Sequence, residues 1–248
     1  MKNKLSIILR LLTRYLRVRI RSGPCKGVLW SLTTRLNFVR GVYEHGLANL
    51  IVATLQPRDI FWDVGAHFGY YTLLASRAVS SGYCHAFEPN PPNLWYLQHH
   101  LRWNRIANAT VHPIALARED GLRRFGGGRG SGSGRLDRGS LKVQTRSMDS
   151  LVRTRTCAAP TFVKMDVQGA EAEILVGAGS VLKEQAPTLC ISTHGAELHA
   201  QCRQILASYG SSLHDFQAEY LLIAVGTGRE IADSMLRNLG PKISLKSV

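Results

Sequence analysis

The stretch that most constrains the fold of this chain is a short apolar run followed by two glycines. Residues 60–72 read Ile-Phe-Trp-Asp-Val-Gly-Ala-His-Phe-Gly-Tyr-Tyr-Thr, and an apolar helical pattern continues to Ala78. A short apolar strand, a glycine turn and a helix are typical of the opening of a nucleotide-binding α/β domain. The stretch therefore predicts a domain of this type, with its first strand at 59–64.

Strand and helix patterns alternate along the rest of the chain. Further strands are expected at 83–88, 109–115, 161–166, 188–193, 213–216 and 220–225. Helices are expected at 69–79, 91–103, 170–182 and 197–209. This alternation predicts a mostly parallel sheet with helices on both faces. The segment 118–139 is different because it contains the glycine-rich run 126–134 and almost no apolar residue. We expect a mobile surface loop there, between short antiparallel strands that end near residues 141–145.

Charge is unevenly distributed over the 248 residues, whose net charge is +14. Residues 1–40 hold ten Lys and Arg and no acid, and residues 102–155 hold twelve against four acids. Basic segments attract the phosphates of nucleic acids or membrane surfaces, although a solvated basic face explains them equally well. We expect a basic amphipathic N-terminal extension at 1–40, a catalytic domain at 41–228 and a C-terminal tail at 229–248.

Residues 1–21 place leucines and isoleucines at helical spacing, with arginines on the other side. The pattern predicts an amphipathic helix, and its apolar runs are too short for a membrane span or a signal peptide. Either the apolar face packs on the domain, or the helix binds anionic lipid. The five cysteines include no C-x-x-C pair, which favours a reducing compartment without a disulfide or zinc framework. We therefore expect a cytoplasmic protein, with peripheral membrane contact as the second interpretation.

Three acids stand at the ends of apolar strands, namely Asp63, Glu88 and Asp166. Because ligands of open α/β sheets bind outside the carboxyl ends of the strands, these acids are expected to converge on one crevice. The spacing Gly65-x-x-x-Gly69 differs from that of a dinucleotide site, and Asp63 beside the turn would repel a pyrophosphate. A ligand with an ammonium and a sulfonium but no phosphate fits better. S-adenosylmethionine (SAM) is therefore the expected cofactor.

Three motifs resemble those of the FkbM family of SAM-dependent methyltransferases. They are Asp-Val-Gly-Ala-His-Phe-Gly-Tyr-Tyr-Thr at 63–72, Phe-Glu-Pro-Asn-Pro at 87–91 and Val-Lys-Met-Asp-Val-Gln-Gly-Ala-Glu at 163–171. Gly-Val-Tyr-Glu at 41–44 and Met-Asp-Ser-Leu at 148–151 fit as well. The resemblance covers about residues 40–225. It implies the class I methyltransferase fold, a Rossmann-like seven-stranded sheet whose last inserted strand is antiparallel, and O-methylation of a sugar, glycan or secondary metabolite.

The resemblance also implies which residues bind the cofactor. They are Tyr43, Glu44, Asp63, Gly65, Ala66, His67, Phe68, Gly69, Thr72, Glu88 and Asn90. Glu88 would hold the ribose, and Asn90 would lie near the adenine. Two residues depart from the family pattern: His67 replaces an Asn, and Gln168 replaces a Glu. Because Gln168 removes a negative charge near the pocket, it argues against metal assistance, and no metal is expected.

Methyl transfer mainly requires alignment and removal of the acceptor proton. The candidate catalytic residues are Asp166 and His194, since His194 follows the strand at 188–193 and should lie at the same sheet edge. A structural hydrogen bond explains His194 equally well. The basic segments leave a nucleic-acid methyltransferase as an alternative, and a non-catalytic binding module is another. We expect a small-molecule or glycan acceptor and no nucleic acid, and the sequence indicates no oligomeric state.

Overall fold

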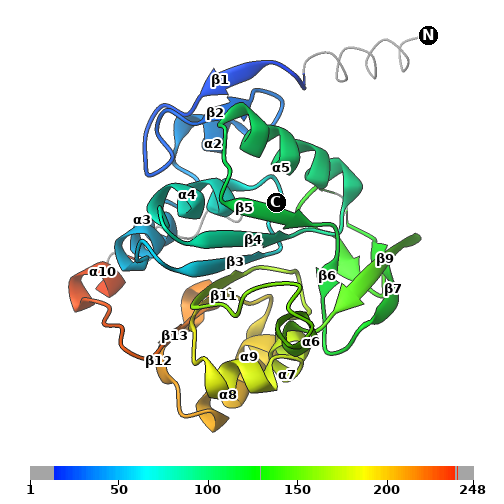
Figure 1. Cartoon of the computed structure of the whole chain (residues 1–248), viewed down its shortest axis with the longest axis vertical. Helices are drawn as coiled ribbons and strands as arrows, with labels where there is room; N and C mark the ends of the chain where they lie inside the picture. The colour runs from blue at the N-terminus through cyan, green and yellow to red at the C-terminus, as the bar shows by residue number, and fades with distance from the viewer. Residues whose placement is uncertain (1–13, 129, 238, 240–248) are drawn as a thin grey trace.

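A seven-stranded sheet forms the centre of the computed structural model, which describes residues 14–128, 130–237 and 239 (Figure 1). Its strands are β3 (Ile60–Val64), β4 (Tyr83–Phe87), β5 (Ala109–His112), β10 (Phe162–Met165), β11 (Thr188–Ser192), β12 (Ser212–Phe216) and β13 (Leu221–Val225). They lie in the order β12-β13-β11-β10-β3-β4-β5. Strand β13 is antiparallel to both neighbours, and the other pairs are parallel. The expected mostly parallel sheet with an antiparallel late strand is confirmed.

Helices cover both faces of this sheet (Figure 1). On one side lie α3 (His45–Thr54), α4 (Tyr70–Ala78) and α5 (Pro91–Trp103), and on the other lie α7 (Glu171–Val176), α8 (Gly179–Glu184) and α9 (Ala196–Ser208). Neighbouring strand residues pack into opposite cores: Phe61 belongs to one and Trp62 to the other, and both are fully buried. Because both faces are covered, the strands read as continuous apolar runs.

The single helix expected over 170–182 is wrong, since two short helices, α7 and α8, occupy this stretch. A Cβ at Gly177, between them, would lie 2.6 Å from the carbonyl oxygens of Ala117 and Arg118. The first turn of α8 donates its N–H groups to Asp149, with Val181 N 2.9 Å from Oδ1. Both interactions come from distant parts of the chain, so the local helical periodicity does not reveal the break.

The N-terminal part contains a β-hairpin. Strands β1 (Arg17–Arg19) and β2 (Leu29–Ser31) pair antiparallel, so the helix expected over 1–21 is wrong for residues 17–19, and residues 1–13 lie outside the described residues. Strand β2 is fixed by tertiary packing, because the buried Trp30 ring stacks on His100 of α5 with 3.8 Å between centroids. Within the described parts of the chain, no helix has the length and hydropathy needed to cross a bilayer.

A second, four-stranded sheet arises from the chain between β5 and β10. It contains β6 (Ala115–Leu116), β7 (Gly121–Gly126), β8 (Arg135–Leu136) and β9 (Leu141–Arg146), in the order β6-β9-β7-β8. The expected antiparallel strands around the glycine-rich run are thus present. The shorter elements are α2 (Leu36–Arg40), α6 (Met148–Arg153), α10 (Asp233–Arg237) and the 3₁₀ turn Gln217–Glu219.

Candidate functional site

A cavity of about 440 Å³ lies beyond the carboxyl ends of β3, β4 and β10. The strand order reverses at this place, because β4 and β5 lie on one side of β3 while β10 and β11 lie on the other. Such a reversal is where open α/β sheets bind ligands. Eight of the expected site residues line the cavity: Tyr43, Glu44, Gly65, Ala66, His67, Phe68, Glu88 and Asp166.

Five expected site residues are not on the cavity wall: Asp63, Gly69, Thr72, Asn90 and His194. Asp63 lies within β3 rather than at its end and is fully buried. Its Oδ2 accepts a hydrogen bond of 2.6 Å from Thr72 Oγ1, so this pair ties β3 to α4. Burial raises the pKa of Asp63. The expectation that Asp63 faces the crevice is therefore wrong, because the side chain is turned to Thr72 and supports the turn instead.

The glycine turn after β3 depends on Gly65. This residue has φ +80°, and a Cβ on it would lie 2.1 Å from the carbonyl oxygen of Asp166. The backbone N–H groups of Gly65 and Ala66 both donate to the carbonyl of Phe87, at 3.0 Å each. Glycine at this position therefore allows the ends of β3, β4 and β10 to meet.

We expect the substitution Gly65→Ala to lower the free energy of unfolding by about 1–3 kcal/mol and to abolish SAM binding. The added methyl group requires both a left-handed backbone and a displacement of the Asp166 carbonyl. Chemical denaturation and titration calorimetry measure the two effects. Gly228→Ala is the matched control, because Gly228 also has a left-handed backbone (φ +72°) but no atom lies within 4 Å of an added Cβ. Unchanged SAM binding in Gly65→Ala would contradict the role of the turn.

Glu88, directly after β4, has a carboxylate that is surrounded by donors. Oε2 accepts from His67 N at 2.8 Å, while Oε1 accepts from Asn90 N at 2.9 Å and from Asn93 Nδ2 at 3.2 Å. The side chain is buried, and this burial raises its pKa to about 7, although the three donors act in the opposite direction. Glu88 therefore changes its charge near neutral pH.

The glycine-rich segment closes one side of the cavity. Residues 130–134 line it, Ser131 Oγ lies 2.9 Å from His67 Nε2, and Asn93 Nδ2 donates to the Ser131 carbonyl at 2.9 Å. Burial lowers the pKa of His67 to about 3, so the ring is neutral. The glycine-rich run therefore contributes to the cavity wall, a role that the sequence did not assign to it. The β7–β8 pairing directs the loop back over the cavity, and the serines among the glycines were the available signal.

Sequence reasoning missed many other residues on the cavity wall, among them Arg35, Phe38, Asn93 and Lys164. Lys164 is nearly fully buried in β10, and its Nζ lies 4.8 Å from the centroid of the Tyr71 ring. A lysine within an otherwise apolar strand is unusual, and this feature could have identified Lys164 as a site residue from the sequence. Arg35 and Phe38 precede residue 41, so the segment expected to be an N-terminal extension contributes to the cavity.

Asp166, His194 and Glu171 form a row of three side chains, in which His194 lies between the two acids. His194 Nε2 lies 3.3 Å from Asp166 Oδ1, and His194 Nδ1 lies 2.8 Å from Glu171 Oε1. Glu171 is fully buried and also accepts from Gly169 N at 2.9 Å and Val167 N at 3.3 Å. Because a carboxylate can only accept, His194 Nδ1 donates to Glu171, and Nε2 attracts the Asp166 carboxylate only when it carries a proton as well. Of the two expected catalytic residues, only Asp166 lines the cavity.

The Methyltransferase FkbM domain model matches residues 63–213, which is more than half of the chain. The chain belongs to this family. The hexuronic acid methyltransferase AglP of Haloferax volcanii is 29% identical over 154 residues, covering 60% of this chain and 61% of that protein. The expected family is confirmed, and methyl transfer from SAM is the activity that this family implies.

Two solved structures share the fold. The methyltransferase FkbM of Methylobacillus flagellatus has a TM-score of 0.52 at 21% identity, covering 69% of this chain and 44% of that one. Precorrin-6y C5,15-methyltransferase of Geobacter metallireducens has a TM-score of 0.50 at 15% identity, covering 74% and 88%. They confirm the expected class I methyltransferase fold. The chain spans less than two thirds of the lengths of AglP and of the Methylobacillus protein.

Proposed function

We propose that this chain transfers a methyl group from SAM to an oxygen atom of a sugar acceptor. The observation that supports the proposal is the cavity after the Gly65 turn, which both Glu88 and Asp166 line, in a domain that the FkbM methyltransferase model matches. A sugar is favoured as acceptor because the relative AglP is named a hexuronic acid methyltransferase.

The residues of the cavity fit SAM. Glu44, Glu88 and Asp166 line it, and carboxylates complement the ammonium and sulfonium charges and accept hydrogen bonds from ribose hydroxyls. Asn93 Oδ1 is buried and has no hydrogen-bond partner among the described residues, so it offers an acceptor to a ligand N–H or O–H. When bound, SAM supplies an already activated sulfonium methyl group.

The protein's own contribution would be alignment and proton removal. The turn from Gly65 to Phe68 would hold the methionine part of the cofactor, and Glu88 its ribose. Asp166 would take the proton of the acceptor hydroxyl, since it is the member of its row that lines the cavity. His194 would act as a positioning residue, fixed by Glu171 and favouring the correct orientation of Asp166. This replaces the expectation that His194 itself contacts the acceptor.

Methyl transfer to sugars tests the proposal directly. The protein is incubated with isotopically labelled SAM and with oligosaccharides that contain either hexuronic acid or only neutral sugars, and the products are examined by mass spectrometry. Brief alkaline treatment removes a methyl ester but leaves a methyl ether, so it identifies the oxygen that is modified. Labelled sugar supports the proposal. Absence of SAM binding in calorimetry, or binding of NAD in its place, would refute it.

The pH dependence of SAM affinity is expected to follow Glu88. Its pKa of about 7 lies above the ordinary value of 4.5, so the carboxyl becomes protonated below neutral pH and loses acceptor capacity for the ribose. SAM should therefore bind more weakly at pH 6 than at pH 8. The Glu88→Gln variant should bind on the order of tenfold to a hundredfold more weakly and lose this pH dependence. Equal pH profiles in both proteins would exclude Glu88 as the titrating group.

Deprotonation of Glu88 should strengthen SAM binding but lower the stability of the free protein. A carboxyl whose pKa rises on folding stabilises the folded state below its unfolded pKa. That contribution is lost as the pH rises from about 4.5 to about 7. SAM binding should recover the loss, and thermal denaturation with and without SAM across this range measures both effects.

A further inference from the structure

Two histidines and a cysteine meet on the side of the sheet away from α4. His85 lies in β4, His112 ends β5, and Cys157 follows α6. His85 Nδ1 is 3.0 Å from His112 Nε2, and Cys157 Sγ is 3.5 Å from the same nitrogen. All three ligand atoms lie within 4.8 Å of one another, and none of these residues lines the SAM cavity. We propose that His85, His112 and Cys157 bind a zinc ion.

The distances match those of a zinc site. Zinc binds histidine nitrogen at about 2.0–2.1 Å and cysteine sulfur at about 2.3 Å in tetrahedral geometry. Two such nitrogens are then about 3.3 Å apart, and a nitrogen and a sulfur about 3.6 Å apart. The observed separations of 3.0 and 3.5 Å need only small side-chain movements to admit the ion.

The donor set favours zinc over the hard cations. Imidazole and thiolate are ligands of zinc and related transition metals, whereas magnesium and calcium prefer oxygen. A second group, Asp166, Glu171 and His194, also has its ligand atoms within 4.8 Å of one another. Both Glu171 oxygens there accept backbone N–H groups, so that group is already occupied by internal hydrogen bonds.

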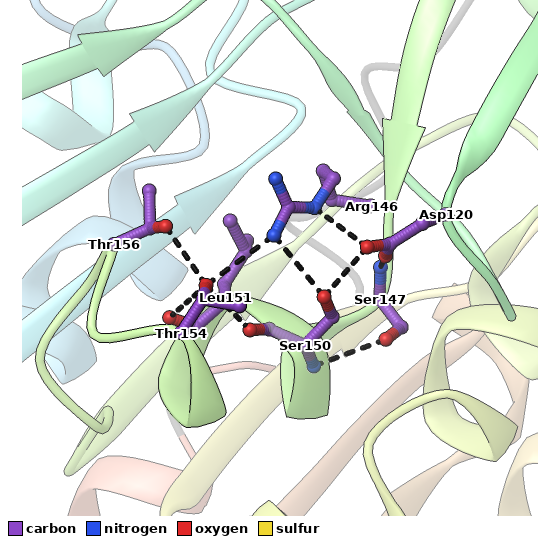
Figure 2. Close-up of polar contacts among 7 residues, drawn as sticks. All are labelled: Asp120, Arg146, Ser147, Ser150, Leu151, Thr154 and Thr156. Carbon is purple, nitrogen blue, oxygen red and sulfur yellow. Dashed lines mark hydrogen bonds and ion pairs between the residues drawn. The ribbon is translucent and has the colours of Figure 1, made fainter.

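Hydrogen bonds hold the turn that leads to Cys157, and Figure 2 shows those made by the side chains of Thr154 and Thr156. The N–H groups of Thr156 and Cys157 both donate to the Leu151 carbonyl, at 3.0 and 3.2 Å. Thr156 Oγ1 lies 2.9 Å from Thr154 Oγ1, which in turn donates to the Ser150 carbonyl at 2.7 Å. This network fixes the thiol in place before any ion arrives, and such preorganisation favours binding.

Arg146, the cation that acts on the Cys157 thiol, is already paired with an acid. Arg146 is close enough to Cys157 to influence its charge, but Arg146 Nε lies 2.9 Å from Asp120 Oδ2 (Figure 2). Its Nη2 donates to Ser150 Oγ at 3.1 Å. The guanidinium is therefore engaged elsewhere, and its repulsion of a metal ion is reduced.

The cluster has a route to solvent and contacts the proposed active site at one residue. His112 is half-buried, so water can reach the ion and take the fourth position. The His112 ring stacks on Phe87, with centroids 4.9 Å apart and an angle of 17° between planes, and Phe87 lines the SAM cavity. Zinc would thus link β4, β5 and the Cys157 loop beneath the cavity wall.

Metal content tests the proposal. The full chain is incubated with zinc under reducing conditions, dialysed and analysed by atomic spectroscopy, and about one zinc per chain is expected to remain. Cobalt in place of zinc should give a thiolate-to-cobalt charge-transfer band in the near ultraviolet. Cys157→Ser should lose this band, and His112→Ala should lose retention of zinc. His45→Ala, an exposed histidine, and Cys202→Ser, a buried cysteine elsewhere, should behave like the wild type.

Two outcomes would overturn the proposal. One is a wild-type chain that loses all zinc on dialysis, which would identify the cluster as a hydrogen-bonded His-His-Cys chain without metal. The other is a cobalt charge-transfer band that persists in Cys157→Ser. Circular dichroism shows whether each variant is folded, and the wild-type results decide the matter even if a variant is not. SAM binding is measured in parallel, so failure here is distinguishable from failure of the proposed methyl transfer.

Discussion

The substitution Asp166→Asn is expected to lower kcat by about 10²–10⁴-fold, which is the usual contribution of a general base. Asparagine keeps the shape of the side chain but cannot take up the proton that the sugar hydroxyl releases. Asp166 lines the cavity, and its Oδ1 lies 3.3 Å from His194 Nε2. SAM affinity should change far less than kcat, and calorimetry together with steady-state kinetics separates the two quantities.

Two further variants define how Asp166 works. His194→Ala should lower kcat by a smaller factor and shift the pH profile of kcat, because it removes the group that faces Asp166. Glu197→Gln changes an exposed acid close in sequence to His194 and should leave both kinetic constants unaltered. If Asp166→Asn retained full activity on a hydroxyl acceptor, Asp166 would not be the base. Full activity only on a carboxylate acceptor would indicate that no base is needed for ester formation.

The substitution Lys164→Met is expected to lower the free energy of unfolding by about 3–5 kcal/mol at pH 7. Burial alone would lower the pKa of the Lys164 ammonium, but four nearby carboxylates outweigh this effect and raise it. They belong to Asp166, Asp63, Glu44 and Glu88. Without the ammonium, these acids, of which Asp63 and Glu88 are buried, would lose the cation that offsets their mutual repulsion. Urea denaturation of the variant and of the wild type measures the loss.

The loss should become smaller at acidic pH, where the acids are protonated and no longer need a cation. Burial already raises the pKa of Asp63, so this residue is expected to respond early as the pH falls. The double variant Asp63→Asn with Lys164→Met should recover part of the stability at pH 7. A destabilisation that is equal at pH 5 and pH 7, with no recovery in the double variant, would show that lost packing rather than lost charge is responsible.

Much of the sheet and part of the site were predictable because they depend on local patterns. The apolar runs before Asp63 and Asp166 and the glycines at 65 and 69 correctly predict strands, a turn and a helix. The carboxyl ends of parallel strands share one edge, which is why Glu88 and Asp166 line the same cavity. The position of the Asp63 side chain was predicted wrongly. Asp63 lies one residue before the end of its strand, and its side chain is directed to Thr72.

Other features depend on contacts between distant segments, which periodicity does not encode. Strand β1 pairs with β2 although its residues also match a helical pattern. Ser131 reaches His67 only because β7 and β8 pair and direct the loop inward. His85, His112 and Cys157 have no recognisable spacing in sequence and come together only when β4, β5 and the loop after α6 are packed.

The four-stranded sheet occupies one uninterrupted stretch of the chain, from residue 115 to residue 146. It supplies Ala115, Leu116, Phe125, Leu136 and the 130–134 segment to the cavity wall. The opposite wall comes from the ends of β3, β4 and β10. This part of the cavity wall therefore comes from one continuous segment of the chain. Substitutions or insertions confined to residues 115–146 can change it without altering the sequence of the glycine turn or Glu88.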